Sequence, residues 1–151
     1  MPSTPESLIR DIHMEFDDVL DFVSGQQACS AQVYAIERGL LSRLLDLGRQ
    51  LLALFLAVRA RESPRTSVAT PHGRRLPYHS DKPRSYLSIF GLIRFARPYF
   101  YARGLGFSVP FDAVLGLPQD RYSDLVRQMS ESLSVEVVAS KRTRIAIPSG
   151  T

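Results

Sequence analysis

The stretch 84–123 constrains the fold most, because its residues alternate with the two-residue period of a β-strand. The alternation breaks once, at Gly91, and resumes as far as Arg97. Glycine tolerates the positive φ that a hairpin turn requires, so the pattern predicts two antiparallel strands joined at Gly91. Pro98 has no backbone N–H group that could donate a hydrogen bond to a neighbouring strand. The second strand is therefore expected to end near Arg97 or to lie on a sheet edge there.

Two helical patterns precede the strands. The first has a hydroxyl cap at Ser3 or Thr4 and a proline at the first helical position, and it stops at Ser24-Gly25. The second runs from about Gln27 to Glu62 and carries an apolar face that must pack on two sides. Within it a heptad seam predicts either intramolecular packing or a homodimer. The seam consists of Leu40, Leu44, Leu47, Leu51, Leu54 and Val58.

These patterns predict an α+β protein: an N-terminal helical hairpin with one long helix, a Pro-rich basic linker, a small antiparallel β-hairpin region and a C-terminal helix. Ser123 is expected to cap the last helix. The expected parts are a helical arm (1–62), a basic Pro-rich linker (63–83), a β-hairpin with a docking segment (84–120), a helix (121–140) and a disordered tail (141–151).

The net charge of +4 is unevenly distributed. Residues 1–37 hold seven acidic residues and one arginine, whereas the segment from Arg59 to Arg103 holds ten basic and two acidic residues. A basic segment of this density favours polyanions, most commonly nucleic acid. A solvated basic surface with no partner is the alternative, because seventeen of the nineteen basic residues are arginine, as a GC-rich genome would encode.

The candidate DNA contacts are the basic residues of the linker and the strands. Tyr78 and Tyr86 are interleaved with them and could stack or wedge against DNA. Arg94 and Arg97 are three residues apart and should point to opposite faces of a flat strand. The candidate DNA-binding residues are Arg74, Arg75, Lys82, Arg84, Arg94, Arg97 and Arg103.

No catalytic or metal-binding set is expected, and no cofactor. Acidic residues of the first helix, such as Asp17 and Asp18, are interpreted as a solvated face, and Cys29 stands alone. The longest apolar run, from Leu51 to Val58, has eight residues, short of the ~20 that span a bilayer. No membrane association is expected. The N-terminus resembles no secretory signal, so the cytoplasm is the expected location.

The order of motifs in 84–135 resembles the N-terminal region of bacterial insertion-sequence transposases of the ISKra type, which are related to the ISLre type. The shared pattern is a threonine or serine before an FG turn, an arginine-rich strand ending in a tyrosine pair, a P-L-D element and a G-L-P…Y-S element. In this chain the third element is Pro110-Phe111-Asp112. The residues that carry it are Ser88, Phe90, Gly91, Arg94, Arg97, Tyr99, Tyr101, Pro110, Phe111, Asp112, Gly116, Leu117, Pro118, Tyr122 and Ser123.

The resemblance implies DNA transposition, in which a downstream RNase H-like domain with three metal-binding carboxylates cuts and rejoins DNA. A chain ending at Thr151 leaves no room for that domain, and the resemblance stops at about Val138. The expectation is therefore a truncated, non-enzymatic fragment that binds or positions DNA at the bacterial nucleoid. The alternative from another class is a helical dimerising module with no DNA role. A third interpretation is a degraded remnant without a role.

Overall fold

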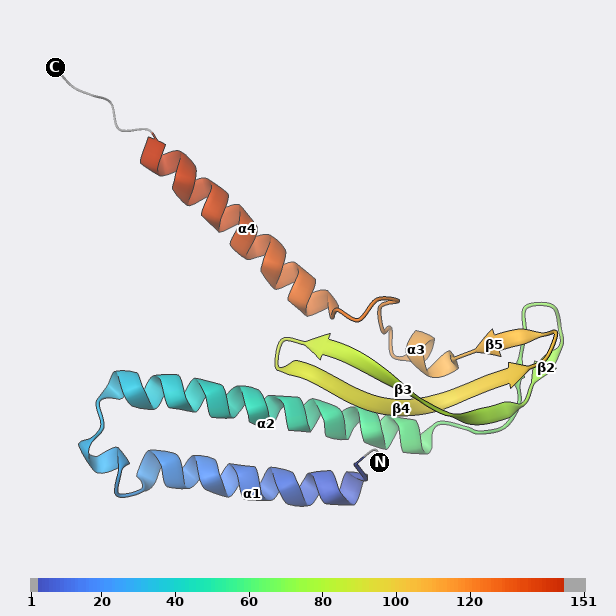
Figure 1. The fold of residues 1–151 in the computed structure, drawn as a ribbon, viewed down its shortest axis with the longest axis horizontal. Coiled ribbons are helices and arrows are strands. Elements are labelled where there is room, and N and C mark those ends of the chain that lie inside the picture. The colour runs from blue at the N-terminus through green and yellow to red at the C-terminus, as the bar shows by residue number, and fades with distance from the viewer. Residues whose placement is uncertain (1–2, 146–151) are drawn as a thin grey trace.

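The structure is a computed structural model that describes the backbone of residues 3–145 and the side chains of residues 3–134. Two N-terminal helices pack beside a small antiparallel sheet, and another long helix follows the sheet (Figure 1). The expected α+β class is confirmed. In chain order the elements are α1 (Pro5–Ser24), η1 (Ala28–Ser30), α2 (Val33–Glu62), β1 (Val68–Ala69), β2 (Arg75–Leu76), β3 (Tyr78–Ser88), β4 (Gly91–Ala102), β5 (Gly106–Ser108), α3 (Pro110–Val114) and α4 (Asp124–Ile145).

The helical hairpin is made of α1 and α2. Thr4 caps α1, because its hydroxyl accepts a hydrogen bond of 3.2 Å from the Ser7 N–H, and Pro5 occupies the first helical position as predicted. The second helix begins at Val33 rather than at Gln27. A chain that reverses direction between antiparallel helices needs non-helical residues, and here they form η1 and a short extended link.

Contacts at both ends hold α1 against α2. A Cβ at Gly39 would stand 2.4 Å from Cζ of Phe22, so the ring lies directly against the α2 backbone. The guanidinium of Arg43 lies over the same ring, 3.6 Å from its centroid. At the other end, Arg61 Nη1 lies 2.5 Å from Glu6 Oε1. The absence of a side chain at Gly39 thus permits the close approach of α1 to α2.

The main sheet has the strand order β3-β4-β5, and all of its pairs are antiparallel. The predicted tight turn joins β3 to β4, with Ser88 paired to Gly91 and φ of +117° at the glycine. The Ser88 hydroxyl donates to Gly91 O at 2.9 Å and accepts from the Phe90 N–H at 3.1 Å. These bonds explain why a serine is buried at this turn.

The strand β4 runs through Pro98, which pairs with Asp81 of β3. On the other side of β4, β5 pairs only with residues 100–102. Pro98 therefore lies where β4 has a partner on one side only. The expectation that the strand lies on a sheet edge at this point is correct.

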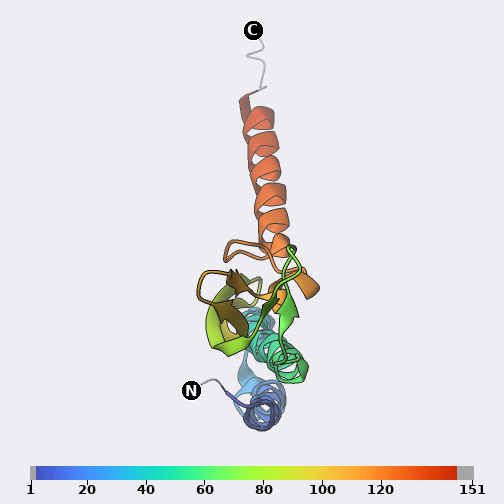
Figure 2. The same ribbon diagram turned by 90° about the vertical axis from the view of Figure 1, so that its right-hand side faces the viewer.

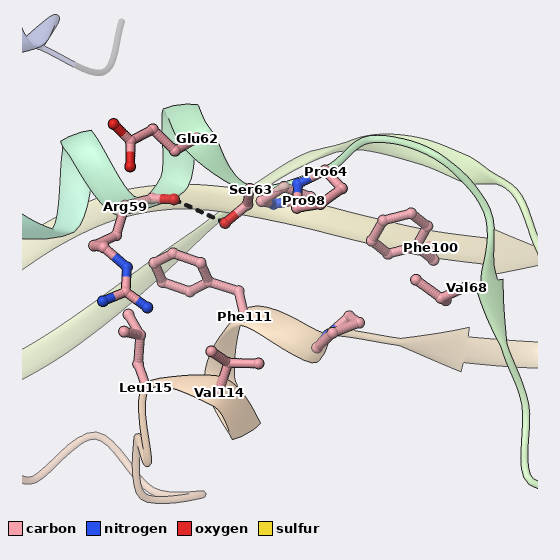
Figure 3. A pocket seen from close by; sticks show the side chains of 11 residues that line it. Arg59, Glu62, Ser63, Pro64, Val68, Pro98, Phe100, Phe111, Val114 and Leu115 are labelled. Carbon is pink, nitrogen blue, oxygen red and sulfur yellow. Dashed lines mark hydrogen bonds between the residues drawn. The ribbon is translucent and has the colours of Figure 1, made fainter.

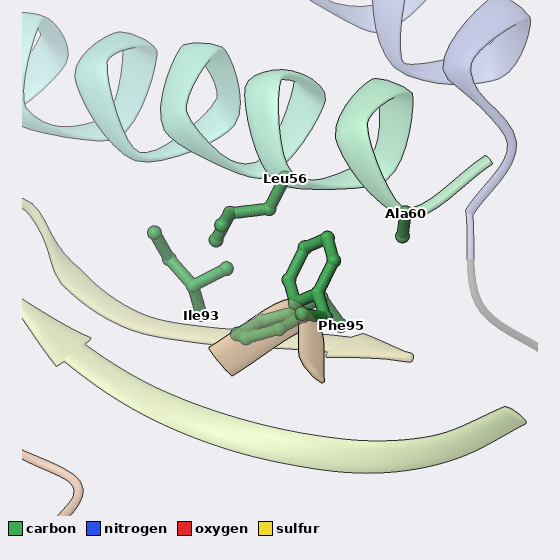
Figure 4. Packing of buried hydrophobic residues seen from close by; sticks show 5 residues of the cluster. Leu56, Ala60, Ile93 and Phe95 are labelled. Atoms are coloured by element: carbon green, nitrogen blue, oxygen red, sulfur yellow. The ribbon is translucent and has the colours of Figure 1, made fainter. Parts of the chain in front are cut away.

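The central core lies between α2 and the sheet. Leu56 and Ala60 of α2 point toward Ile93 and Phe95 of β4 (Figure 4). Phe111 of α3 completes this buried cluster, with its ring centroid 5.9 Å from that of Phe95. The cluster therefore joins α2 and α3 to one face of the sheet.

Burial changes faces along β4. Ile93 and Phe95 are buried on one face, whereas Pro98 and Phe100, which have the opposite parity, are buried farther along. Val68 of β1 lines one pocket with Pro98 and Phe100, and Leu76 of β2 is almost fully buried. The odd-numbered residues beyond Arg97, Tyr99 and Tyr101, are less buried than Pro98 and Phe100.

The segment after α3 crosses the edge of β3 before α4 begins. Leu87 donates its N–H to Arg121 O at 2.6 Å and accepts from the Ser123 N–H at 3.0 Å. Ser123 caps α4, since its hydroxyl accepts the Val126 N–H at 3.0 Å. Seen end-on, α2 lies between α1 and the sheet, and α4 projects away on the far side (Figure 2).

Two sequence-based boundaries differ from the observed elements. The segment 63–83 was expected to be a linker, but it contains β1 and β2, and Tyr78 to Pro83 belong to β3. Pairing with β4 decides this, because a strand can extend wherever a partner strand satisfies its backbone. Residues 141–145, expected in a disordered tail, belong to α4, and 146–151 lie outside the described residues. No helix within residues 3–145 is long and apolar enough to cross a membrane.

Candidate nucleic-acid interface

Two of the seven candidate residues are engaged inside the protein. Arg97 and Arg84 both bind the carboxylate of Asp112, and we call these three residues the Asp112 cluster. Arg97 donates from Nε to Oδ1 and from Nη2 to Oδ2, each at 3.0 Å, and Arg84 Nη1 lies 2.8 Å from Oδ2. The three side chains are only 11% to 22% exposed.

The remaining N–H groups of the Asp112 cluster bind backbone carbonyls. Arg97 Nη1 donates to the carbonyls of Lys82 and Pro83 at 3.1 and 3.2 Å. Arg84 Nη2 donates to the carbonyls of Pro118 and Asp120. The cluster therefore ties α3 and the segment leading to α4 onto the sheet, and it gives both arginines a folding role, whereas charge alone selects them as DNA contacts.

Three other candidates meet at the distal end of the sheet, far from the β3–β4 turn. Arg74 lies in the turn between β1 and β2, and Arg103 lies in the turn between β4 and β5. The two turns line one open pocket of about 610 Å³, to which Arg74 and Phe107 contribute. Arg75 is exposed and donates to Ser67 at 2.8 Å. The distal end thus gathers positive charge from two separate turns.

Lys82 stands beside a group of aromatic side chains on the same face of the sheet. Its Nζ lies 3.8 Å from the ring centroid of Tyr99. Tyr99 stacks with Tyr101 at 6.3 Å and with Phe107 at 5.8 Å between centroids, and the edge of His79 meets both tyrosines. We call His79, Tyr99, Tyr101 and Phe107 the aromatic platform.

The aromatic platform is accessible. Phe107 is 69% exposed and Tyr101 is 40% exposed. The sequence had instead singled out Tyr78 and Tyr86 as partners for DNA. Tyr86 packs on the core cluster, and the Tyr78 hydroxyl donates to Asp81 at 3.2 Å. The alternation of the strand could have revealed the platform, since Tyr99 and Tyr101 share a face, but their exposure depends on which face the helices cover.

Arg94 lies apart from the distal end. It is exposed, and it borders a groove of about 290 Å³ together with Arg61, Arg65 and the N-terminal end of α1. As expected, Arg94 and Arg97 lie on opposite faces of β4, because Arg97 shares the parity of Phe95. Of these two arginines, only Arg97 forms an ion pair among the described side chains.

Carboxylates are scarce around these cations. Between 63 and 118 the chain has two acidic residues, Asp81 and Asp112. Asp81 binds Arg65 at 2.9 Å, and Asp112 binds the two arginines of its cluster. Within residues 3–134, the remaining five candidates form no ion pair. These are Arg74, Arg75, Lys82, Arg94 and Arg103.

A larger, mostly apolar pocket of about 630 Å³ opens between the end of α2, the sheet and α3 (Figure 3). One side of the pocket is lined by Phe111 and Val114 of α3 and by Leu115 at the end of that helix. Arg59 of α2 borders the pocket on another side. The Ser63 hydroxyl donates a hydrogen bond of 2.8 Å to the Arg59 carbonyl. The pocket presents no set of acid, base and nucleophile. In the described part of the chain, no three His, Cys, Asp or Glu side chains are close enough to hold a metal ion.

Comparisons of the chain with protein-family models, with curated proteins and with solved structures each gave no match.

Proposed function

We propose that the chain is a DNA-holding, non-catalytic part of an insertion-sequence transposase, in which the distal end of the sheet contacts the DNA. Arg74, Arg75 and Arg103 bind phosphates, Lys82 supplies a further cation beside Tyr99, and the aromatic platform receives exposed bases or sugars. Such a fragment would act in the bacterial cytoplasm, at the nucleoid.

One observation carries this proposal. Every carboxylate between 63 and 118 is paired with an arginine, whereas the cations at the distal end have no carboxylate partner among the described side chains. Uncompensated cations on two adjacent turns create a positive potential that attracts polyanions. Beside them, stacked and exposed aromatic rings offer the surfaces on which bases stack in single-stranded regions.

The transposase part of the proposal depends on the resemblance of 84–135. Several of the residues that carry it have matched structural tasks: Arg97 binds Asp112, Gly91 makes the turn and Ser123 caps α4. This supports interpreting the motif as one folding unit that presents the distal end and carries two rings of the platform, Tyr99 and Tyr101, while the phosphate contacts are made by other residues.

The test is a titration with labelled duplex and single-stranded oligonucleotides at two salt concentrations, followed by fluorescence anisotropy. We expect saturable binding that weakens with salt. The double variant Arg74→Gln/Arg103→Gln should lower affinity and reduce the slope of log K against log salt by about 0.9 for each phosphate that is no longer bound. The matched control, Arg10→Gln/Arg38→Gln, removes the same charge from exposed positions on the helices.

If both double variants lose the same affinity, the loss depends only on the net charge of the protein. That result would contradict a defined DNA interface at the distal end. Absence of saturable binding at low salt would favour the second candidate, a helical dimerising module with no DNA role. The observation that favours this second candidate is the exposed apolar surface of α1 and α2, which is independent of the sheet.

A further inference from the structure

The helical hairpin exposes an apolar row on each of its two helices. On α1 the row contains Ile9, Phe16, Leu20 and Val23, with spacings of seven, four and three residues. On α2 it contains Leu44, Leu51 and Phe55, with spacings of seven and four. All seven side chains are between 40% and 49% exposed. Such spacings are those of an interhelical seam, whereas scattered surface residues show no heptad order.

The two rows lie on the same side of the hairpin. At 100° per residue, the α1 row is about a quarter turn from the side, marked by Val19 and Phe22, that faces α2. The α2 row is about a third of a turn from Gly39 and Arg43, which face α1. Because the helices are antiparallel, these rotations bring both rows to one face. Leu56, through which the sheet contacts α2, is about a third of a turn from the α2 row, so the sheet leaves that row open.

Half-buried residues fill the floor between the rows. Leu40, Leu47, Leu54 and Val58 of the heptad seam are partly covered in the hairpin, whereas Leu44 and Leu51 are open. The seam predicted from the sequence is thus one part of a wider surface to which α1 also contributes.

Charge identifies the partner that fits this surface. Helix α1 carries six carboxylates and one arginine, a balance of −5, while α2 carries five arginines and three carboxylates, a balance of +2. Two copies of the face can meet with α1 on α1 or with α1 on α2. The first arrangement opposes two acidic helices, and the second opposes helices of opposite charge.

We propose that two copies of this chain form a four-helix bundle through this face, with α1 of each copy antiparallel to α2 of the other. The two-fold axis then runs parallel to the helices, and the same surface is used by both copies. A 20-residue helix is about 30 Å long, and two helices are about 20 Å wide. Each face therefore covers roughly 600 Å² in projection, close to the roughly 800 Å² per partner of a standard interface.

The bundle places both sheets at the same end of the dimer, on its two outer flanks, because α2 lies between α1 and the sheet in each copy. Dimerisation in this form involves the helices alone and does not depend on DNA binding. The dimer can therefore be tested without DNA, and the oligonucleotide titration can be repeated on a monomeric variant.

The first experiment is sedimentation equilibrium on the full chain. We expect a dimer, and we expect Phe16→Glu/Leu51→Glu to be monomeric with unchanged helical circular dichroism. The matched control, Met129→Glu/Leu133→Glu, places the same charges on the exposed apolar positions of α4 and should remain dimeric. A monomeric wild-type chain at high micromolar concentration would refute the proposal, as would equal dissociation of the two variants.

The second experiment tests how the copies pair. Two single-cysteine chains, Leu20→Cys and Leu44→Cys, are made on a Cys29→Ser background and oxidised separately and as a mixture. The proposed pairing brings Leu20 of one copy near Leu44 of the other, so a disulfide-linked heterodimer should form in the mixture and neither chain should link efficiently to itself. Efficient linking of Leu20→Cys alone, without a heterodimer, would overturn the pairing of α1 with α2.

Discussion

Asp112 on α3 holds Arg97 on β4 in a two-pronged ion pair, with both hydrogen bonds 3.0 Å long. Arg84 binds the same carboxylate from β3. A planar guanidinium matches a carboxylate in this way, which a lysine cannot do. Together with the buried side chain of Phe111, the pair fixes α3 on the sheet, since a five-residue helix is too short to be stable by itself.

Replacing Asp112 by asparagine should therefore destabilise the protein. The substitution keeps the shape but leaves two largely buried guanidinium groups without a counter-charge, which should cost about 2–4 kcal/mol in the free energy of unfolding. Urea denaturation measures the change. Asp46→Asn, which removes an exposed ion pair with Arg49, is the control and should cost less than about 0.5 kcal/mol. Similar costs at both positions would show that the cluster has no special role.

Gly48→Ala should also destabilise, although alanine is the better helix former by about 1 kcal/mol. A Cβ at this position would stand 2.6 Å from Cδ1 of Phe90 in the β3–β4 turn. We expect a net decrease of about 1–3 kcal/mol in stability from this overpacking, measured by thermal and urea unfolding. In a Phe90→Leu background the same substitution should cost clearly less. An equal cost in the two backgrounds would place the strain elsewhere.

Removing aromatic rings from the platform should weaken the binding of single-stranded oligonucleotides without changing its salt dependence. Tyr101→Ala and Phe107→Ala should each reduce the binding free energy by about 1–3 kcal/mol if a base stacks on the ring. The slope of log K against log salt should stay at its original value, because every bound phosphate keeps its cation. Val114→Ala, at an exposed apolar position on α3, is the control. Unchanged affinity in both platform variants would exclude stacking there.

The start of α4 should respond to acid through Asp120. Its carboxylate binds Arg127 Nη2 at 2.6 Å and accepts the Tyr122 N–H at 3.0 Å. The Arg127 hydrogen bond, followed by that of the backbone, lowers the pKa of Asp120 below its ordinary value. This stabilisation is present above the pKa of the unfolded chain, near ~4, and disappears as pH falls through the lower folded value.

Arg127→Gln should consequently raise the pKa of Asp120 toward its ordinary value. A carbon-detected NMR titration of the carboxyl group measures this directly. Arg121→Gln removes a neighbouring exposed guanidinium that makes no ion pair within the described side chains, and it serves as the control. A pKa that is identical in wild type and Arg127→Gln would contradict the assigned cause.

Local signals in the sequence predicted the individual elements well. Thr4 with Pro5, the turn at Gly91 and the cap at Ser123 each act over a few residues, and each is found where expected. The predictions failed where contact with a segment far away in the sequence determines the local structure. The four prolines of 63–83 indicate a linker, yet pairing with β4 makes Tyr78 to Pro83 part of a strand.

The same limit applies to the candidate site. Charge counting selected seven basic residues, but it cannot distinguish a cation that binds DNA from one that binds a carboxylate elsewhere in the chain. Arg84 and Arg97 are engaged by Asp112, which follows Arg97 by fifteen residues, and only the packing of α3 on the sheet brings them together. Arg74 and Arg103 show the converse case, since two separate turns bring them to one end.

The sequence by itself determined the helices, the hairpin turn and the excess of positive charge, because propensity, capping and alternation act over short distances. Only the tertiary structure decided which cations are engaged by carboxylates, which aromatic rings are exposed and which apolar rows share a face. Those properties depend on which surfaces the helices cover, and that is settled by contacts between residues far apart in the chain.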